Sequence, residues 1–173
     1  MEQGQFCFIT DEFYSIHDKE RKLMRNKESV DGREHSRPCF YAFADKNNPL
    51  ILWCVPISSQ IEKYTRIYNH KLSKQREKGI KTPNCNTIRF GEVMGTNKAF
   101  LIQNMFPIIR KYISEIYINR QTQEAVRIPQ NAERDIIGYA EDVLRLVRSG
   151  NKHLVFSDII KIYNDLIAEL NQQ

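Results

Sequence analysis

Apolar residues are spaced as in β-strands through the first third of the chain. Three stretches rich in aromatic and β-branched residues predict strands: QFCFI at 5–9, PCFYAFA at 38–44 and PLILWCV at 49–55. The turn-forming cluster DKNN at 45–48 separates the last two, which predicts a β-hairpin. The highly charged residues 17–37 predict an exposed connector with room for a short helix.

The period of the apolar residues changes to that of a helix at Ser58. Apolar positions then recur on one helical face, at Ile61, Tyr64, Ile67, Tyr68 and Leu72. Ser58 or Ser59 is the expected N-cap, with Glu62 in the capping-box position three residues after Ser59. Gly79 is expected to end the helix, and residues 82–86 to form a loop.

Strand patterns return in the second half of the chain. Residues 86–95 and 97–105 predict a second hairpin that turns at 95–97, and Pro107 is expected to end its second strand. Residues 108–118 fit either a helix or a strand, and residues 124–128 predict a further short strand.

Two amphipathic helices are predicted at the C-terminal end. One covers residues 133–150, and the other begins at a Ser157 cap and runs to residue 170. Together these patterns predict an α+β fold of five or six antiparallel strands, with a helix inserted after the third strand and two helices packed on one face of the sheet.

Composition limits the classes of protein to which the chain can belong. Its 173 residues, 41% apolar and 27% charged, predict one globular domain spanning 1–173. No stretch has the length and polarity of a signal peptide or a membrane span, so we expect a cytoplasmic protein with no membrane partner. Four cysteines without paired spacing predict buried free thiols: Cys7, Cys39, Cys54 and Cys85.

Positive charge gathers in the inserted helix. The net charge is +5, and residues 58–81 alone carry seven bases against two acids. Such a segment favours a polyanionic partner, although it is also typical of a solvated helix face. The bases that we predict to bind such a polyanion are Arg66, Lys71, Lys74, Arg76, Lys78 and Lys81.

No nucleotide-binding loop, zinc-ligand cluster or serine-hydrolase motif occurs, so we expect neither a cofactor nor a metal. The segment VPISSQIEKYTRIY at 55–68 is a candidate phosphate site, because a helix N-terminus beside hydroxyl groups attracts anions. Ser58 and Ser59 would supply the hydroxyls, and Lys63 and Arg37 positive charge. From their spacing alone, the two serines are more typical of a simple N-cap than of a phosphate site.

Three segments, taken in order, resemble a known family of toxins. They are RPCFYAF at 37–43, LWCVPISSQIEKY at 52–64 and FGEVMGTNKAFLIQNMFPI at 90–108. The sequence resembles the toxins of type III toxin–antitoxin systems, the ToxN/AbiQ family, and within it most closely the CptN branch. The resemblance extends over about residues 6–117.

The resemblance implies a compact, barrel-like antiparallel sheet similar to that of the MazF/Kid toxins, elaborated with helices. It implies a metal-independent endoribonuclease that cleaves cellular or phage RNA in abortive-infection defence. It also implies inhibition by a repeat-derived pseudoknot RNA, the antitoxin, within a closed hetero-oligomer of alternating toxin and RNA.

The family's hydroxyl pair falls on Ser58 and Ser59, and its basic residue falls on Arg37. In the family, a lysine follows the hydroxyl pair about two residues sooner than Lys63 does in this chain. Where some members have a tyrosine this chain has Glu34 and His35, and His35 is the residue nearby whose pKa suits acid–base work at neutral pH.

Two other functions remain open from the sequence. One is a non-catalytic RNA-binding module that uses the same basic helix, and the other is a MazF-like ribonuclease inhibited by a protein antitoxin. Short tandem repeats upstream of the gene would favour an RNA antitoxin, whereas a small acidic reading frame would favour a protein.

Overall fold

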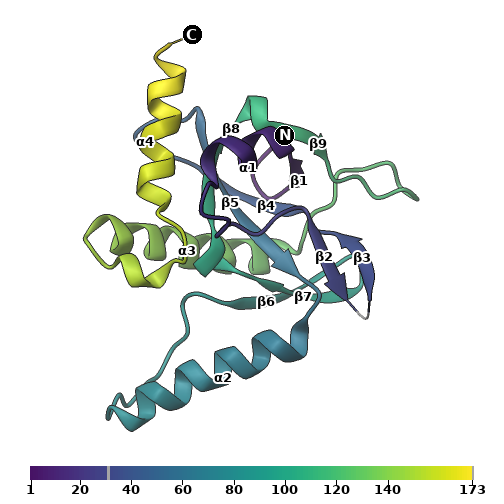
Figure 1. Cartoon of the computed structure of the whole chain (residues 1–173). Helices are drawn as coiled ribbons and strands as arrows, with labels where there is room; N and C mark the ends of the chain where they lie inside the picture. The colour runs from purple at the N-terminus through teal and green to yellow at the C-terminus, as the bar shows by residue number, and fades with distance from the viewer. Residues whose placement is uncertain (31, 173) are drawn as a thin grey trace.

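The computed structural model describes residues 1–30 and 32–172, without the side chains of residues 28–30 and 33–35 (Figure 1). The strands are β1 (Phe6–Ile9), β2 (Lys27–Val30), β3 (Arg33–Ser36), β4 (Cys39–Ala44), β5 (Ile51–Ser58), β6 (Arg89–Val93), β7 (Thr96–Phe100), β8 (Phe106–Ile109) and β9 (Ile113–Ile116). The helices are α1 (Asp11–His17), α2 (Ile61–Glu77), α3 (Gln130–Arg148) and α4 (Ile159–Leu170), with short 3₁₀ turns at Ile102–Asn104, Arg110–Tyr112 and Lys152–Leu154.

Within the described residues, seven strands form one antiparallel sheet in the order β6-β7-β5-β4-β1-β9, with β8 also paired to β5. The strand β5 is the centre of this arrangement, because one of its edges is shared between two partners. Its Ile51–Cys54 part pairs with β8, and Ile57 and Ser58 pair with β7. The α+β class and the β4–β5 hairpin are therefore as predicted.

The expectation of a barrel-like sheet is corrected, since the sheet is open. It branches at β5, and among the described strands no pairing joins β6 to β9. A closed barrel would need that final pairing.

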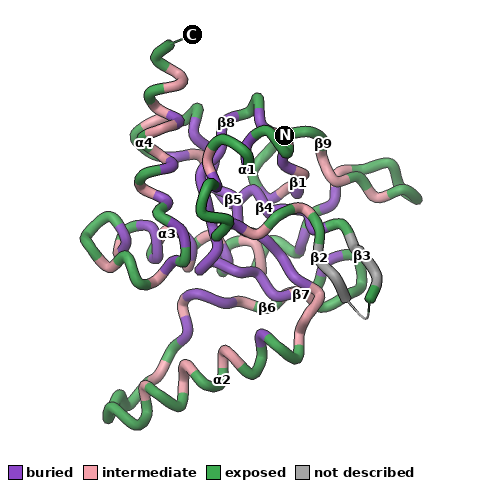
Figure 2. The backbone as a smooth tube through the Cα atoms, viewed as in Figure 1, coloured by how far each residue is buried: buried purple, intermediate pink, exposed green. Residues whose placement is uncertain are grey.

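Among the described residues the buried hydrophobic side chains form three clusters, and buried positions are purple in Figure 2. The first lies between the sheet and the apolar stripe of α3, and the second lies between the sheet, α1 and α4. In the third, Tyr64 of α2 is buried against Ile88 and Leu101, while the rest of the predicted α2 stripe is half-buried there. The predicted stripes of α2 and of the C-terminal helices are thus confirmed.

The charged connector differs from its prediction. It contains the β2–β3 hairpin, which forms a separate two-stranded sheet, and the short helix α1 precedes it. Alternating charges with few apolar residues carry no period-two hydrophobic signal, so the hairpin could not be recognised from its sequence.

The second half of the sheet also differs in detail. The hairpin turns at Met94 and Gly95, whose φ angles of 51° and 73° suit a two-residue turn better than the expected 95–97. Pro107 lies inside β8 opposite Trp53, which is tolerated because β8 pairs on one side only. Residues 124–128 make a single bridge, between Ile118 and Ala125, in place of a strand.

The predicted helix caps are wrong at two positions. Gln60 occupies the N-cap of α2 and makes no side-chain cap hydrogen bond, because the backbone remains extended through Ser58 at the end of β5. Asp158, and not Ser157, caps α4 by accepting a hydrogen bond from the Lys161 amide. The end of α2 is as expected, with Gly79 at a φ of 78°.

Candidate active site

The start of β4 and the end of β5 lie at the same edge of the sheet because the two strands are antiparallel. Cys39 is paired with Pro56, so Arg37 and Pro38 lie near Ile57 and Ser59. On the other side of β5, Ser58 is paired with Ala99 of β7, which brings Lys98 to the same edge. The topology thus gathers residues from three separated segments.

These residues line a cavity of about 260 Å³. Its lining consists of Ser36, Arg37, Pro38, Ile57, Ser59, Val93, Met94, Thr96, Lys98 and Tyr117. The described lining holds two basic side chains and no carboxylate, together with three aliphatic hydroxyl groups and a phenol. A concave surface of this composition favours an anion such as a phosphate.

The direct contact inside the cavity joins Ser59 to Lys98. The Lys98 ammonium donates a hydrogen bond to the Ser59 hydroxyl across 2.5 Å, and both side chains are partly exposed. A cation and a hydroxyl held this close can both donate to the oxygens of one phosphate group. Sequence patterns did not single out Lys98, because its position depends on the pairing of β5 with β7.

Ser58 has a different environment from Ser59. It is 2% exposed, its hydroxyl accepts a hydrogen bond from the Gln60 amide at 3.2 Å, and it is not part of the cavity lining. The two serines therefore have separate positions, with Ser58 in the turn that enters α2 and Ser59 in the cavity.

Arg37 lies at the cavity and also supports its wall. The residue is 8% exposed, and its guanidinium donates to the backbone carbonyls of Arg25 at 2.9 Å and Lys27 at 3.1 Å. Lys27 is the first residue of β2. Arg37 therefore connects the β2–β3 hairpin to the edge of the main sheet.

Of the other two predicted catalytic residues, Lys63 does not line the described cavity, and His35 is described only by its backbone. Lys63 is exposed on the first turn of α2, with its ammonium 5.5 Å from the centre of the Tyr64 ring. His35 belongs to β3, one residue before the cavity residue Ser36, and its side chain lies outside the described part of the structure.

The predicted RNA-binding bases of α2 divide into two groups. Exposed side chains belong to Arg66, Lys74, Arg76, Lys78 and Lys81. Lys71 is half-buried, and its ammonium donates to Thr87 and to Gln103, each at 2.6 Å. Burial lowers the pKa of Lys71, so this residue holds α2 against the sheet and does not extend into solvent.

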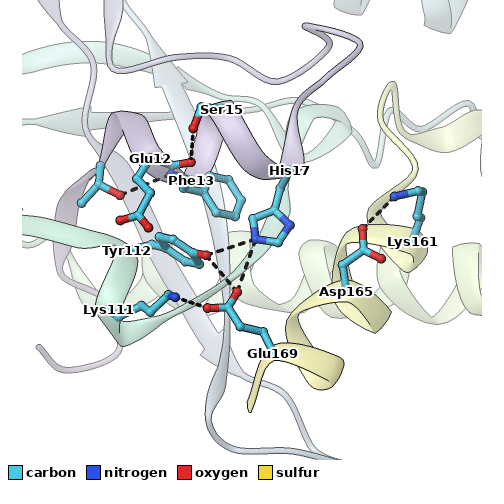
Figure 3. A network of polar contacts seen from close by, with 10 residues as sticks. Glu12, Phe13, Ser15, His17, Lys111, Tyr112, Lys161, Asp165 and Glu169 are labelled. Carbon is cyan, nitrogen blue, oxygen red and sulfur yellow. Dashed lines mark hydrogen bonds and ion pairs between the residues drawn. The ribbon is translucent and has the colours of Figure 1, made fainter. Parts of the chain in front are cut away.

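A second polar cluster joins α1, the 3₁₀ turn before β9 and α4 (Figure 3). The Tyr112 hydroxyl donates to Glu169 at 2.8 Å, Lys111 forms an ion pair with the same carboxylate, and His17 lies 3.6 Å from it. Burial lowers the pKa of His17, against the opposing effect of Glu169. None of these residues lines the cavity, and their contacts are those of a link between α1 and α4.

The described residues provide neither a membrane-spanning helix nor a cluster of metal ligands. No helix there is both long and apolar enough to cross a membrane. In that same part of the chain, no group of three or more His, Cys, Asp or Glu side chains is arranged to hold a metal ion. The four cysteines are buried free thiols, as predicted.

No protein-family model matches the sequence, and no curated protein matches it. A solved structure does match: AbiQ, a lactococcal anti-phage endoribonuclease belonging to the type III toxin–antitoxin system. The TM-score is 0.64, over 99% of this chain and 100% of the AbiQ chain. This chain has the AbiQ fold.

The structural match to AbiQ extends over almost the whole length of both chains, so it includes the helices as well as the sheet. The sequence identity is 14%, so the match is one of architecture. It agrees with the resemblance seen in the three sequence motifs. The CptN branch and the MazF-like features stay predictions.

Proposed function

We propose that this chain is an endoribonuclease toxin of the type III toxin–antitoxin class. The observation that carries the proposal is the Ser59–Lys98 contact in a cavity with two basic groups and no described carboxylate, within a chain that has the AbiQ fold. The three sequence motifs add independent support, because 37–43, 52–64 and 90–108 each contribute residues to that cavity.

The proposed reaction uses the substrate's own ribose as the nucleophile, so it does not require a metal ion. The 2′-hydroxyl oxygen attacks the adjacent phosphorus, and its proton passes to a general base. The bond from phosphorus to the 5′-oxygen breaks, and that oxygen receives a proton from a general acid. The products are a 2′,3′-cyclic phosphate and a 5′-hydroxyl.

The residues of the cavity have distinct parts in this reaction. Lys98 and Ser59 donate hydrogen bonds to the non-bridging oxygens as negative charge develops on the phosphorane. Arg37, two residues before β4, adds positive charge. His35 remains the proposed proton-transfer group, and Ser58 shapes the turn that places Ser59. Lys98 has the role that the sequence assigned to Lys63.

The proposed partner is an RNA antitoxin, a repeat-derived pseudoknot, which occupies the same surface as the substrate in a closed toxin–RNA assembly. The exposed bases of α2 would bind its backbone beside the cavity. Substrate and antitoxin should therefore compete.

Two variants distinguish a role of Ser59 in cleavage from a role in RNA binding. Ser59→Ala should lower kcat/KM for single-stranded RNA by about 100-fold while RNA affinity changes by less than about threefold, because the hydroxyl acts on the developing charge. The exposed Ser114→Ala is the matched control and should retain full activity. Equal losses of binding and cleavage in Ser59→Ala would instead favour a non-catalytic RNA-binding module.

A further inference from the structure

A second hollow, of about 780 Å³, adjoins the candidate active site. Ser36, Met94 and Tyr117 line both the cavity and this hollow, so the two form one continuous groove. The second hollow is bounded by β9 and the segment that follows it, residues 115–123. RNA that enters the cavity would therefore have a neighbouring nucleotide beside this segment.

The charge of the second hollow differs from that of the cavity and of α2. Its described lining has one acid, Glu115, and one base, Arg120, whereas the cavity has two bases and no described acid. A surface of balanced charge offers little attraction to a phosphate backbone. Its ligand should therefore be an uncharged part of the nucleotide.

An aromatic pair forms one part of the groove. The rings of Phe8 and Tyr117 meet edge to face, with centroids 5.6 Å apart and planes at 80°. Both side chains are partly exposed, and Met94 and Ile118 add apolar surface beside them, with exposed fractions of 49% and 46%. Aromatic side chains at this exposure are suited to stacking on a nucleobase.

A hydrogen-bonded turn forms the opposite part. The amide of Gln123 donates to the Asn119 carbonyl, the amide of Asn119 to the Glu124 carbonyl, and the amide of Gln121 to the Asn119 side chain, each at 2.8 Å. The side-chain amide of Gln121 has no hydrogen bond within the described chain, and it lines the hollow. It is therefore available to the edge of a base.

We infer that this groove binds the nucleobase next to the scissile phosphate, with Tyr117 stacking on its face and Gln121 reading its edge. The inference rests on the proposed function for the identity of the neighbouring cavity. It assigns sequence preference to the segment after β9 and non-specific affinity to α2.

The first test measures stacking and does not depend on cleavage. A single-stranded 2′-O-methyl RNA, which lacks the attacking hydroxyl, carries one 2-aminopurine at successive positions, and its fluorescence is quenched by stacking. Wild-type protein should quench one position most strongly. Tyr117→Ala should remove that quench and Tyr117→Phe should keep it. Phe156→Ala, at a 59% exposed aromatic residue elsewhere, should match wild type.

The second test measures base preference on cleavable RNA. Four oligonucleotides that differ only in the base beside the mapped cleavage site are compared by kcat/KM. Gln121→Ala should reduce the ratio between the best and worst base by about tenfold, because a base edge is then left without its partner. An unchanged quench in Tyr117→Ala, or an unchanged ratio between the best and worst base in Gln121→Ala, overturns the inference. If the wild-type protein cleaves none of the four oligonucleotides, that result counts against the proposed function and not against base binding in the groove.

Discussion

At the residue scale, the candidate site depends on two side chains that are 39 positions apart in the chain. Ser59 lies just beyond the end of β5, and Lys98 is in the middle of β7. The ammonium of Lys98 approaches the hydroxyl across 2.5 Å without a carboxylate among the described cavity residues. A cation in such surroundings is more strongly attracted to an incoming phosphate than one already paired with an acid.

Lys98→Met should lower kcat/KM for RNA cleavage by about 100-fold, which is the usual effect of removing one donor to a developing oxyanion. Lys63→Met, on the exposed first turn of α2, should lower it by less than about fivefold. Lys152→Met is the control for loss of one exposed charge. The measurement is initial-rate cleavage of a fluorescent oligonucleotide, with circular dichroism to check folding. A larger loss in Lys63→Met than in Lys98→Met would contradict the assignment.

Of the three cavity side chains to which we assign a role at the phosphate, the sequence predicts two. Arg37 and Ser59 were predicted because each lies in a short motif beside a recognisable strand. Lys98 could not be, because strand order within a sheet is a long-range property with no local pattern. Lys63 was chosen because it is close in sequence, yet the start of α2 at Ile61 places it on the exposed side of the helix.

Asp45 holds the two C-terminal helices to the sheet. Its buried carboxylate accepts hydrogen bonds from Trp53 at 2.8 Å, from Arg148 of α3 at 2.5 Å and from Tyr163 of α4 at 3.3 Å. Burial would raise the pKa of Asp45, but the donors from Trp53, the Asn47 amide and Arg148 outweigh it and hold the pKa below its ordinary value of 3.8. The ionised form is therefore the one that stabilises the fold.

Asp45→Asn should lower the free energy of unfolding by about 2 kcal/mol at neutral pH, since Arg148 loses its charged partner. A carboxyl whose pKa is lowered on folding stabilises above its unfolded pKa, and this contribution disappears as pH falls through the folded pKa. The difference between wild type and variant should therefore shrink as the pH falls from neutral through the lowered pKa of Asp45. Urea unfolding measures it, and a difference independent of pH would contradict the role of the ionised carboxylate.

At the scale of elements, α2 combines packing and charge on different faces. Tyr64 and Lys71 face the sheet, while most of the helix surface is exposed, as Figure 2 shows. Lys71 takes part in this packing through its hydrogen bonds to Thr87 and Gln103. Among the described bases of this helix, Lys71 is half-buried and the others are exposed to solvent.

The double variant Lys74→Gln and Lys78→Gln should weaken RNA binding and reduce its dependence on salt. Each phosphate contact with single-stranded nucleic acid contributes about 0.7 to the slope of log K against log salt, so the slope should fall by about 1.4. Lys46→Gln with Lys152→Gln is the control of equal charge on other elements. Fluorescence anisotropy at several salt concentrations measures both. Equal slopes in the two double variants would contradict α2 as the backbone-binding element.

The sequence indicated most helices and strands correctly, and its failures have physical causes. Hydrophobic periodicity predicted β1, β4, β5 and the faces of α2, α3 and α4 because each buries an apolar side. The sequence of the β2–β3 hairpin has no alternation of apolar and polar residues. The open sheet could not be distinguished from a closed one, because closure depends on whether the end strands β6 and β9 pair, which no local sequence pattern determines.

At the scale of the whole molecule, the cavity residue Ser59 lies between the end of β5 and the start of the long basic helix α2, which follows that strand in Figure 1. The two features suit a ligand that is both a substrate and a polyanion. Under the proposed function, a folded RNA that binds α2 and enters the cavity would exclude the substrate.

The central claim is cleavage through the substrate's 2′-hydroxyl. It is tested most directly with two RNA oligonucleotides that contain one mapped cleavage site and differ by a single 2′-deoxy substitution there, incubated with RNA-free protein in EDTA. We predict that the all-ribose strand is cut to a 2′,3′-cyclic phosphate and a 5′-hydroxyl and that the deoxy strand remains intact. Cleavage of both strands, or of neither by folded protein, would contradict it.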